Sequence, residues 1–578
     1  MKNIFKRTPV LWVFIYFVLL TIAMTWPLVT RMGDSLVGMI GDNIYFVWMI
    51  GWFKEALFVQ HVNPFNIWFL NYPEGWSLAY TEITQANLAL ALPFTFLGNE
   101  IFAYNAAMML TFALSGLFMS IWVKHLTNRW DAALIAGTIY AFLPYHFAHF
   151  RIGHLNLSGT QWFPLFFMGL LEILQLKKVN WRYIILTGIS LGLIALTSQY
   201  YFYMCVLVTG FSALIVLVFK QREQFKNLAF WKNIIFSALV SLPLIAAAVW
   251  PYLQLFGQGD MPDRNISIVR RYSASVTDFL LPSTDHFLLG GWIGEHFSRD
   301  LWIEGSLTIG FVALVLLFIA WRKRKELQQE TVMRFLLIGL LVAVILAMGT
   351  DLHWNEQSVE IPLRGLLAEK LGRDNLPIPL PGYLFFYVLP FFAKLRALMR
   401  FGILALVFSS AAAGLGASWL LQRKNGKAQI ATTALLLGLV VFEFYPGVYQ
   451  QFDQVSYREA DQWLAEQADD RALMQFPYEL LEDQEHIYYQ LINKKPFVGG
   501  FFNAFPPQQY REIKDVMEQF PSQESIMLTE SLGVGTVFVD ETYYENDQEI
   551  IDLFESNKWQ YIMQMGNELV FTFEAGDE

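Results

Sequence analysis

A carboxylate beside an aromatic stretch is the first group in this sequence that could do chemistry. Asp42 follows Gly41 and precedes the aromatic segment 45–52. A positioned carboxylate can take the proton of an attacking hydroxyl and speed the reaction by about 10²–10⁴-fold. The alternative is that Asp42 caps the helix that opens at Asn43, because aspartate is favoured there. The two roles are compatible only if one carboxylate oxygen stays free.

Glu82 is a second acidic candidate in the same segment of the chain. Glutamate side chains are mostly exposed in proteins, so the alternative for Glu82 is a solvated or capping residue. Tyr80, two residues earlier, is a candidate substrate contact. We therefore group Glu82 with Asp42 as candidate catalytic acids and Tyr80 with the candidate substrate-binding residues.

Arginines that could stabilise a departing phosphate stand before a late hydrophobic run. Arg396 and Arg400 are four residues apart, which predicts one shared helix face. The forked donors of arginine suit phosphate oxygens, whereas the alternative is that both side chains reach toward lipid headgroups. Arg270 is a weaker phosphate candidate, because its neighbour Arg271 cannot face the same ligand from a helix.

Three histidines and an arginine share one polar and aromatic turn. His146, His149 and His154 could hold a divalent metal, but their spacing matches no known zinc pattern. We therefore assign no metal ligand and leave a divalent metal open as a cofactor. His154 and Arg151 are instead candidate contacts to substrate.

The composition shows what must position these groups. Of the 578 residues, 55% are hydrophobic and only 16% are charged, against about 25% charged in soluble proteins. Apolar runs near the length of about 20 residues needed to cross a bilayer recur along the chain, so we expect a polytopic all-α membrane protein. Basic clusters between the runs favour the cytoplasmic side. This rule predicts about 11 transmembrane helices with the N-terminus, which carries Lys2, Lys6 and Arg7, in the cytoplasm.

The same topology places three long segments on the outer side of the membrane. They are residues 29–101, 253–302 and 350–397 of a transmembrane domain that we expect to cover 1–450. Within the first segment, residues 44–59 carry Tyr45, Trp48 and Trp52 and are expected to form an interfacial helix, because such aromatic residues favour the headgroup level. The candidate acids and arginines all fall on the outer side or at its edge.

Residues 451–578 read as a separate, small extracytoplasmic soluble domain of α/β or α+β type. They contain 7 Lys and Arg against 26 Asp and Glu, a net charge of -19, whereas the rest of the chain carries +9. Strand-like and helical patterns alternate there. The single cysteine, Cys205, lies in a hydrophobic run, so an intramolecular disulfide is excluded.

The order of these elements resembles the GT-C superfamily of membrane glycosyltransferases, which includes the protein O-mannosyltransferases and the aminoarabinose transferase. One helix, an outer loop opening with an acid, six helices and a second outer loop is their plan. Several short strings also resemble a bacterial branch with an outer C-terminal domain: Gly41-Asp42, Tyr72-Pro73-Glu74-Gly75, Gly153-His154-Leu155, Trp162-Phe163-Pro164-Leu165, Leu281-Pro282-Ser283, Arg396 with Arg400-Phe401, and Lys495-Pro496-Phe497-Val498-Gly499-Gly500.

The resemblance implies an activity and roles for the candidate residues. It implies an inverting transfer of a sugar from a polyprenyl-phosphate-linked donor, on the outer face of a bacterial plasma (inner) membrane, to a cell-wall polymer, a lipid or a protein. Asp42 then stands where the superfamily keeps its catalytic acid, Glu82 where some members keep a second one, and Arg400 where donor phosphate is bound. Some members require a divalent metal and others do not.

Two functions of other classes stay open from the sequence. A transporter or flippase of a lipid-linked saccharide would need ionisable residues within its spans, and only Glu172 and Glu443, both near span ends, are candidates. A noncatalytic envelope-assembly protein could share the same fold. The sequence holds no phosphate-binding loop and no nucleic-acid-binding motif.

Overall fold

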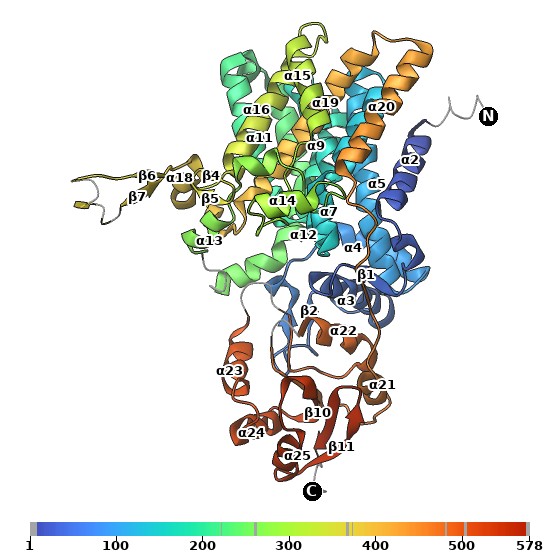
Figure 1. Ribbon diagram of the computed structural model, residues 1–578, viewed down its shortest axis with the longest axis vertical. Coiled ribbons are helices and arrows are strands. Elements are labelled where there is room, and N and C mark those ends of the chain that lie inside the picture. Colours follow the sequence, from blue (N-terminus) through green and yellow to red (C-terminus); the bar gives the residue numbers. More distant parts are fainter. Residues whose placement is uncertain are drawn as a thin grey trace.

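The long apolar helices form one end of the molecule, the C-terminal segment forms the opposite end, and the first outer segment lies between them (Figure 1). The computed structural model describes residues 9–220, 222–258, 263–365, 369–370, 372, 374–479, 483–501 and 506–573. The basic N-terminal cluster of Lys2, Lys6 and Arg7 lies outside the described residues.

Seven helical stretches in the described part of the chain are long and apolar enough to cross a membrane. They are α5 (Glu100–Thr127), α8 (Leu155–Ser158) joined with α9 (Trp162–Gln175), α11 (Gln199–Lys220), α12 (Leu228–Gln258), α16 (Glu330–Ala347), η8 (Leu398–Phe401) joined with α19 (Gly402–Leu421), and α20 (Gly426–Phe444). The chain is thus a mostly helical, multi-pass membrane protein.

The other expected spans are occupied by shorter helices. These are α2 (Pro9–Met24), α6 (Trp130–Ala141), α10 (Trp181–Thr197) and α15 (Phe311–Lys323). The helices α6 and α15 have 12 and 13 residues, fewer than the roughly 20 that cross a hydrocarbon core. The count of about 11 spans therefore stays a prediction.

Helix α19 runs through the centre of the helical part and is buried over nearly its whole length. Small residues allow α19 to pack closely against its neighbours in this central position. A Cβ on Gly416 would lie 1.9 Å from the carbonyl oxygen of Leu316 in α15, and one on Gly414 would lie 2.7 Å from Val123 in α5. Such residues let helix backbones approach closely in membranes. The N-terminal end of this central helix carries Arg400, in η8.

The first outer segment folds over the bundle as a series of short elements. It contains β1 (Ser35–Val37), α3 (Asp42–Lys54), the π-helix η2 (Glu55–Gln60), the hairpin of β2 (Asn66–Ile67) and β3 (Trp76–Ser77), η3 (Leu78–Tyr80), α4 (Gln85–Ala91) and η4 (Leu92–Phe96). The other two outer segments contain α13 (Ile266–Arg271), η6 (Val276–Phe279), α14 (Gly290–His296), the hairpins β4–β5 (His353–Trp354, Gln357–Ser358) and β6–β7 (Glu360–Pro362, Asn375–Pro377), and α18 (Pro381–Val388).

The expectation that α3 is an interfacial helix is wrong. Tyr45 and Trp48 are fully buried, and Trp52 is 2% exposed. The aromatic face that would suit lipid headgroups packs instead against protein, with Trp48 stacked on Trp76 and Tyr45 against Phe501. The C-terminal segment covers this face, which the local pattern of α3 could not reveal.

The C-terminal part contains a four-stranded sheet in the order β11-β12-β10-β9. Strands β9 (Ala472–Phe476) and β10 (Val534–Asp540) are parallel, while β12 (Glu568–Phe573) pairs antiparallel with β10 and with β11 (Trp559–Met565). The helices of this part are α21 (Glu459–Ala465), α22 (Asp483–Asn493), α23 (Gln508–Met517), α24 (Gln523–Ser531) and α25 (Asp547–Glu555).

The C-terminal part is fastened to the first outer segment by backbone and side-chain contacts. Strand β8 (Phe452–Gln454) pairs antiparallel with β1, and the Ile40 amide donates to Asp453 Oδ2 at 2.9 Å. Phe497, in one of the strings quoted above, bridges to Leu70. The first two contacts lie just before the helix that begins with Asp42, and the third lies in the loop of the β2–β3 hairpin that follows it.

Candidate active site

Asp42 is the first residue of α3, and its side chain does not cap that helix. The neighbouring Asn43 satisfies the turn instead, because its Oδ1 accepts hydrogen bonds from the amides of Gly41 at 2.8 Å and Ile44 at 2.9 Å. The Asp42 carboxylate is 38% exposed and accepts a hydrogen bond from His154 Nε2 at 3.0 Å. The capping interpretation is therefore wrong, and the carboxylate is directed toward a distant part of the chain.

Two glycines explain how that distant part reaches Asp42. Helix α7 (Pro144–Arg151) ends before Gly153, which has φ +80° and lies so close to Asn43 that an added Cβ would be 2.2 Å from the Asn43 Cβ. On the opposite side of this contact, Gly38 has φ +84°, and a Cβ there would lie 2.2 Å from the Arg151 carbonyl oxygen. The Gly153 turn thus rests on the backbone beside Asp42 and brings His154 to the carboxylate.

A line of polar side chains continues inward from His154. His154 Nδ1 lies 2.9 Å from Nδ1 of the fully buried His149. His149 Nε2 lies 4.0 Å from Glu304 Oε2 and has no hydrogen-bond partner in the described part of the chain. Glu304 in turn accepts from Arg400 Nε, at 2.9 Å to each carboxylate oxygen. The line connects Asp42 to Arg400 across four segments of the fold.

Glu82 is half-buried and held from both sides by the chain around it. Asn156 Nδ2 donates a hydrogen bond to Glu82 Oε2. The Tyr252 hydroxyl, from α12, donates to the Thr81 carbonyl and accepts from the Ile83 amide, each at 3.0 Å. The loop is therefore fixed at the residues that flank the carboxylate.

The environments of the two acids move their pKa values in opposite directions. Burial alone would raise the pKa of Asp42, but the hydrogen bond and charge of His154 and the charges of Arg396 and Arg400 outweigh it and lower the pKa. Burial raises the pKa of Glu82, although Arg400, His154 and Arg396 oppose it. Two acids with separated pKa values are the arrangement that divides base and acid roles in enzymes.

The structure separates the roles of Arg400 and Arg396. Arg400 is 4% exposed, paired with Glu304, and lies over the Tyr200 ring at 5.3 Å. Glu304 lies in the turn before α15, where burial would raise its pKa but Arg400 holds it well below the usual value. Arg400 is thus committed to a buried ion pair.

Arg396 is half-buried and lies over the Tyr272 ring at 5.2 Å. No carboxylate among the described residues lies within 4.0 Å of its guanidinium. The expectation that both arginines share one helix face is wrong, because Arg396 precedes the helix and Arg400 lies in the 3₁₀ turn η8. The positive charge of Arg396 nevertheless lowers the pKa values of both Asp42 and Glu82. Arg396 is therefore a cation close to both acids, and it has no acidic partner in the described chain.

The remaining candidates have other partners. Arg270 Nε pairs with Asp351 Oδ1 at 2.9 Å, beside His353, whose Nε2 is 3.1 Å from Asp351 Oδ2. Arg151 pairs with Asp285 and lies over the Trp302 ring at 5.2 Å. Tyr80 is the last residue of η3. The structure does not join Arg270 to the Asp42 cluster. Arg151, in contrast, is three residues before His154, which contacts Asp42.

The three histidines of the polar turn do not converge. His146 stacks on Phe112 with ring centroids 3.7 Å apart and contacts Thr111 Oγ1 and the Ala141 carbonyl, each at 3.0 Å. Only His149 and His154 face one another. Within the described ranges, no group of three or more His, Cys, Asp or Glu side chains could hold a metal ion.

Comparison with known proteins gives a family. Residues 50–373, more than half of the chain, match the family profile described as Domain of unknown function (DUF6311). The chain belongs to the DUF6311 family. The matched part of this DUF6311 chain contains Glu82, His154 and Glu304 but neither Asp42 nor Arg400. No curated protein matches the sequence.

Solved structures identify the fold of this DUF6311 chain. The apo oligosaccharyltransferase from Archaeoglobus fulgidus aligns over 93% of the chain and 70% of its own, with TM-score 0.53 and 12% identity. The arabinofuranosyltransferase AftD from Mycobacteria aligns over 99% of the chain and 40% of its own, with TM-score 0.51 and 14% identity. ArnT from Cupriavidus metallidurans, bound to undecaprenyl phosphate, aligns over 99% of both chains with 11% identity and a lower TM-score of 0.45. The GT-C fold expected from the sequence is confirmed.

Several residues of the site were not assigned a role from the sequence. Glu304, Asn156 and Tyr252 belong to three different elements and contact Arg400, Glu82 and the Glu82 loop. Glu304 did carry a signal, because it is an acid beside a hydrophobic run and needs a partner when buried. Asn156 and Tyr252 carry no comparable signal.

Proposed function

We propose that the protein is an inverting glycosyltransferase that moves a sugar from a polyprenyl-phosphate-linked donor to a hydroxyl or amine acceptor on the outer face of a bacterial plasma membrane. The observation that carries the proposal is Asp42. Its carboxylate is free of the capping role, partly exposed, held by His154 and shifted toward the ionised form. A carboxylate that is positioned, accessible and ionised can accept the proton of an attacking group.

In the proposed reaction, Asp42 accepts the proton of the acceptor while the acceptor's oxygen or nitrogen attacks the anomeric carbon. The bond from that carbon to the phosphate oxygen breaks, and the lipid phosphate leaves with the bonding electrons. A single displacement inverts the anomeric configuration. Arg396 stabilises the charge that develops on the phosphate, and Arg400 supports the site through Glu304.

Glu82 has a distinct place in this scheme. Burial raises its pKa, so Glu82 holds a proton more readily than Asp42, and a carboxyl in its protonated form can donate a hydrogen bond. We propose that Glu82 donates to the phosphate or sugar side of the substrate. His154, Arg151 and Tyr80 are proposed substrate contacts, and Arg270 a more distant contact to donor phosphate.

The fold supports this kind of activity over a transporter. The two acids near span ends have structural partners: Glu172 contacts His125 Nε2 at 2.8 Å, and Glu443 accepts from the amides of Phe311 and Val312 at the start of α15. Neither is left as an unpaired charge on a translocation path. Glycosyltransferases are also the proteins to which the fold is similar.

The test is transfer by the full chain reconstituted in vesicles with a panel of polyprenyl-phosphate sugars and a membrane extract that supplies acceptors. We expect release of polyprenyl phosphate, lost in Asp42→Asn and retained in Asp300→Asn, a matched change at an exposed outer-segment aspartate. Transfer that survives Asp42→Asn in a folded protein contradicts the mechanism. Movement of intact donor across the vesicle membrane without release would favour a flippase, and neither result would favour an assembly role.

A further inference from the structure

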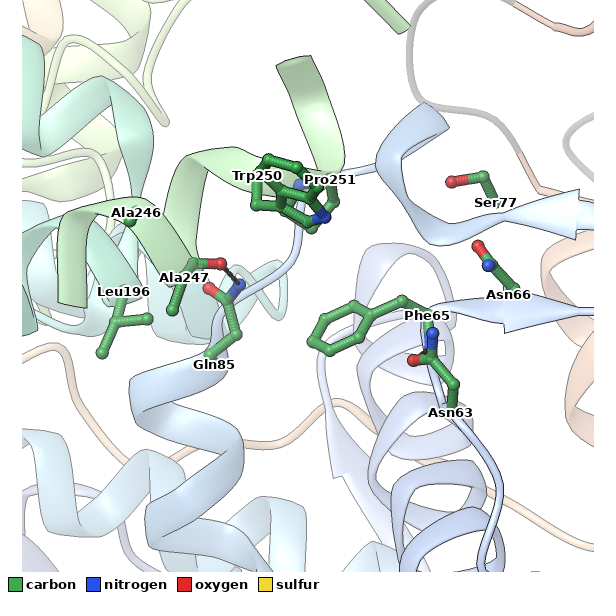
Figure 2. A pocket seen from close by; sticks show the side chains of 10 residues that line it. All are labelled: Asn63, Phe65, Asn66, Ser77, Gln85, Leu196, Ala246, Ala247, Trp250 and Pro251. Carbon is green, nitrogen blue, oxygen red and sulfur yellow. Dashed lines mark hydrogen bonds between the residues drawn. The ribbon is translucent and has the colours of Figure 1, made fainter. Parts of the chain in front are cut away.

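A pocket of about 570 Å³ lies beside the proposed active site, within the range of 300–1,000 Å³ typical of small-molecule sites. It is lined by residues in and just before the β2–β3 hairpin, at the start of α4, and in the C-terminal parts of α10 and α12. Figure 2 shows Phe65 facing Trp250 and Pro251 across the gap. The lining residues are Asn63, Phe65, Asn66, Ser77, Gln85, Leu196, Ala246, Ala247, Trp250 and Pro251.

One wall of the pocket belongs to a helix that is apolar and exposed enough to contact lipid. The apolar stretch Leu228–Leu253 of α12 is long enough to cross a membrane, and only 22% of its most apolar window is buried. At its end, Trp250 is 64% exposed and Leu253 is 54% exposed. An aliphatic chain that lies along this exposed apolar face can therefore reach the pocket.

The polar part of the lining is uncharged. Three amide side chains and one hydroxyl supply it, and none of the ten lining residues is ionisable. Gln85 Nε2 donates to the Ala247 carbonyl at 3.4 Å (Figure 2), while Gln85 Oε1 is buried with no partner in the described part of the chain. A buried acceptor without a donor is costly. The amides and the hydroxyl of the lining can pair with a hydroxyl group of a ligand, whereas a phosphate would find no cation here.

The pocket is joined to the Glu82 loop through the chain. Pro251 lines the pocket and Tyr252 follows it directly, with its hydroxyl bonded on both sides of Glu82. Gln85 lies three residues beyond Glu82 and closes the same loop. The hydroxyl-binding end of the pocket therefore adjoins the acid, and its apolar wall adjoins the membrane.

We propose that this pocket binds a bilayer lipid with an uncharged, hydroxyl-bearing headgroup, and that this lipid is the acceptor. The acceptor role rests on the proposed function. In that role the lipid hydroxyl loses its proton to Asp42 and gains the sugar, while the donor leaves as polyprenyl phosphate. Binding of the neutral lipid does not depend on transfer, so the two claims can be tested apart.

The test uses diacylglycerol that carries a diazirine in one acyl chain, incorporated into nanodiscs with the full chain. After irradiation, peptide mass spectrometry locates the label. We expect it on segments 63–66 and 246–251. Ala247→Trp, which fills the pocket, should lower labelling about tenfold, equivalent to 1.4 kcal/mol of binding. Ala238→Trp, at an exposed alanine of the same helix outside the pocket, should leave it unchanged.

Two further arms decide between occupants. Gln85→Leu should weaken labelling by diacylglycerol but not by a diazirine phospholipid, since it removes one of the polar groups that can pair with the hydroxyl. Equal labelling of the two tryptophan variants overturns the proposal, as does displacement of the label by polyprenyl phosphate at lower concentration than by unlabelled diacylglycerol. Asp42→Asn should retain labelling while losing transfer. Labelling of the unsubstituted protein without any transfer counts against the proposed enzyme while leaving the lipid site intact.

Discussion

His154 Nε2 lies 3.0 Å from Asp42 Oδ2, and Nδ1 of the same ring lies 2.9 Å from Nδ1 of His149. Both nitrogens of His154 are thus engaged, so the ring cannot rotate without losing two contacts. Because His149 is fully buried in α7, it holds the His154 ring in the plane that meets the carboxylate. Second partners of this kind fix the orientation of a reacting group.

Removing His154 should shift the pH dependence of transfer. The pKa of Asp42 is lowered in part by His154, so in His154→Phe that pKa rises. The base is then protonated at higher pH, and the acid limb of the profile of kcat/KM against pH moves upward. His296→Phe, at an exposed histidine of α14, is the control. An acid limb that stays in place in His154→Phe would show that the imidazole does not act on the base.

Gly153→Ala should damage the site although it changes no polar group. The new Cβ would meet the Asn43 side chain and backbone, and φ +80° is unfavourable for alanine. We expect a loss of about 1–3 kcal/mol in unfolding free energy, as for overpacked sites, together with reduced transfer. Gly291→Ala, where nothing lies within 4 Å, should have neither effect. The measurements are thermal unfolding in detergent and the release assay.

Arg400 and Arg396 should behave differently when neutralised. Arg400→Gln leaves Glu304 buried without its cation, which typically costs about 3–5 kcal/mol of stability. Arg396→Gln breaks no ion pair in the described structure, so stability should change by less than about 0.5 kcal/mol while affinity for undecaprenyl phosphate falls. Melting temperature and lipid binding of each variant test this division. A stable Arg400→Gln protein with weakened lipid binding would reverse it.

Stability should also depend on Glu568 of β12. Burial raises its pKa from 4.5 to about 7, although Arg458 Nη1 at 2.6 Å opposes the shift and Asp540 and Asp461 add to it. A raised pKa in the folded state means that the protonated form is favoured on folding, so unfolding free energy falls as pH rises from about 4.5 through about 7. Glu568→Gln should flatten this dependence in thermal unfolding of the full chain, and Glu555→Gln, at an exposed position, should not.

Much of the fold could be predicted because membrane helices can be recognised from the hydrophobic composition of contiguous sequence. Apolar runs and the acidic C-terminal segment are properties of contiguous sequence, and the order of runs and loops was enough to indicate the GT-C fold. The exact helix lengths were less accessible. Helix α6 ends at Ala141, shortly before Pro144, and α15 begins only at Phe311. Both helices are therefore shorter than a full span.

The site was only partly predictable because its residues meet through tertiary contacts. Asp42 and His154 could each be selected by type and position. Their mutual contact depends on the close approach of Gly38 to the Arg151 backbone and of Gly153 to Asn43. Local sequence patterns do not predict such long-range contacts. Likewise Glu304 and Arg400 are separated by 96 residues. The sequence therefore made both arginines phosphate candidates with Arg400 first, whereas burial and pairing commit Arg400 to Glu304 and leave Arg396 without an acidic partner in the described chain.

The pairing of β1 with β8 links the segment before Asp42 to the start of the C-terminal part. Strand β1 ends five residues before Asp42, and its partner belongs to the C-terminal part. The backbone that carries Asp42 is thus shaped by a segment more than 400 residues away in sequence. A C-terminal part transplanted from a relative would have to bring a matching strand with it, so the two parts are expected to evolve as one unit rather than to be exchanged as separate modules.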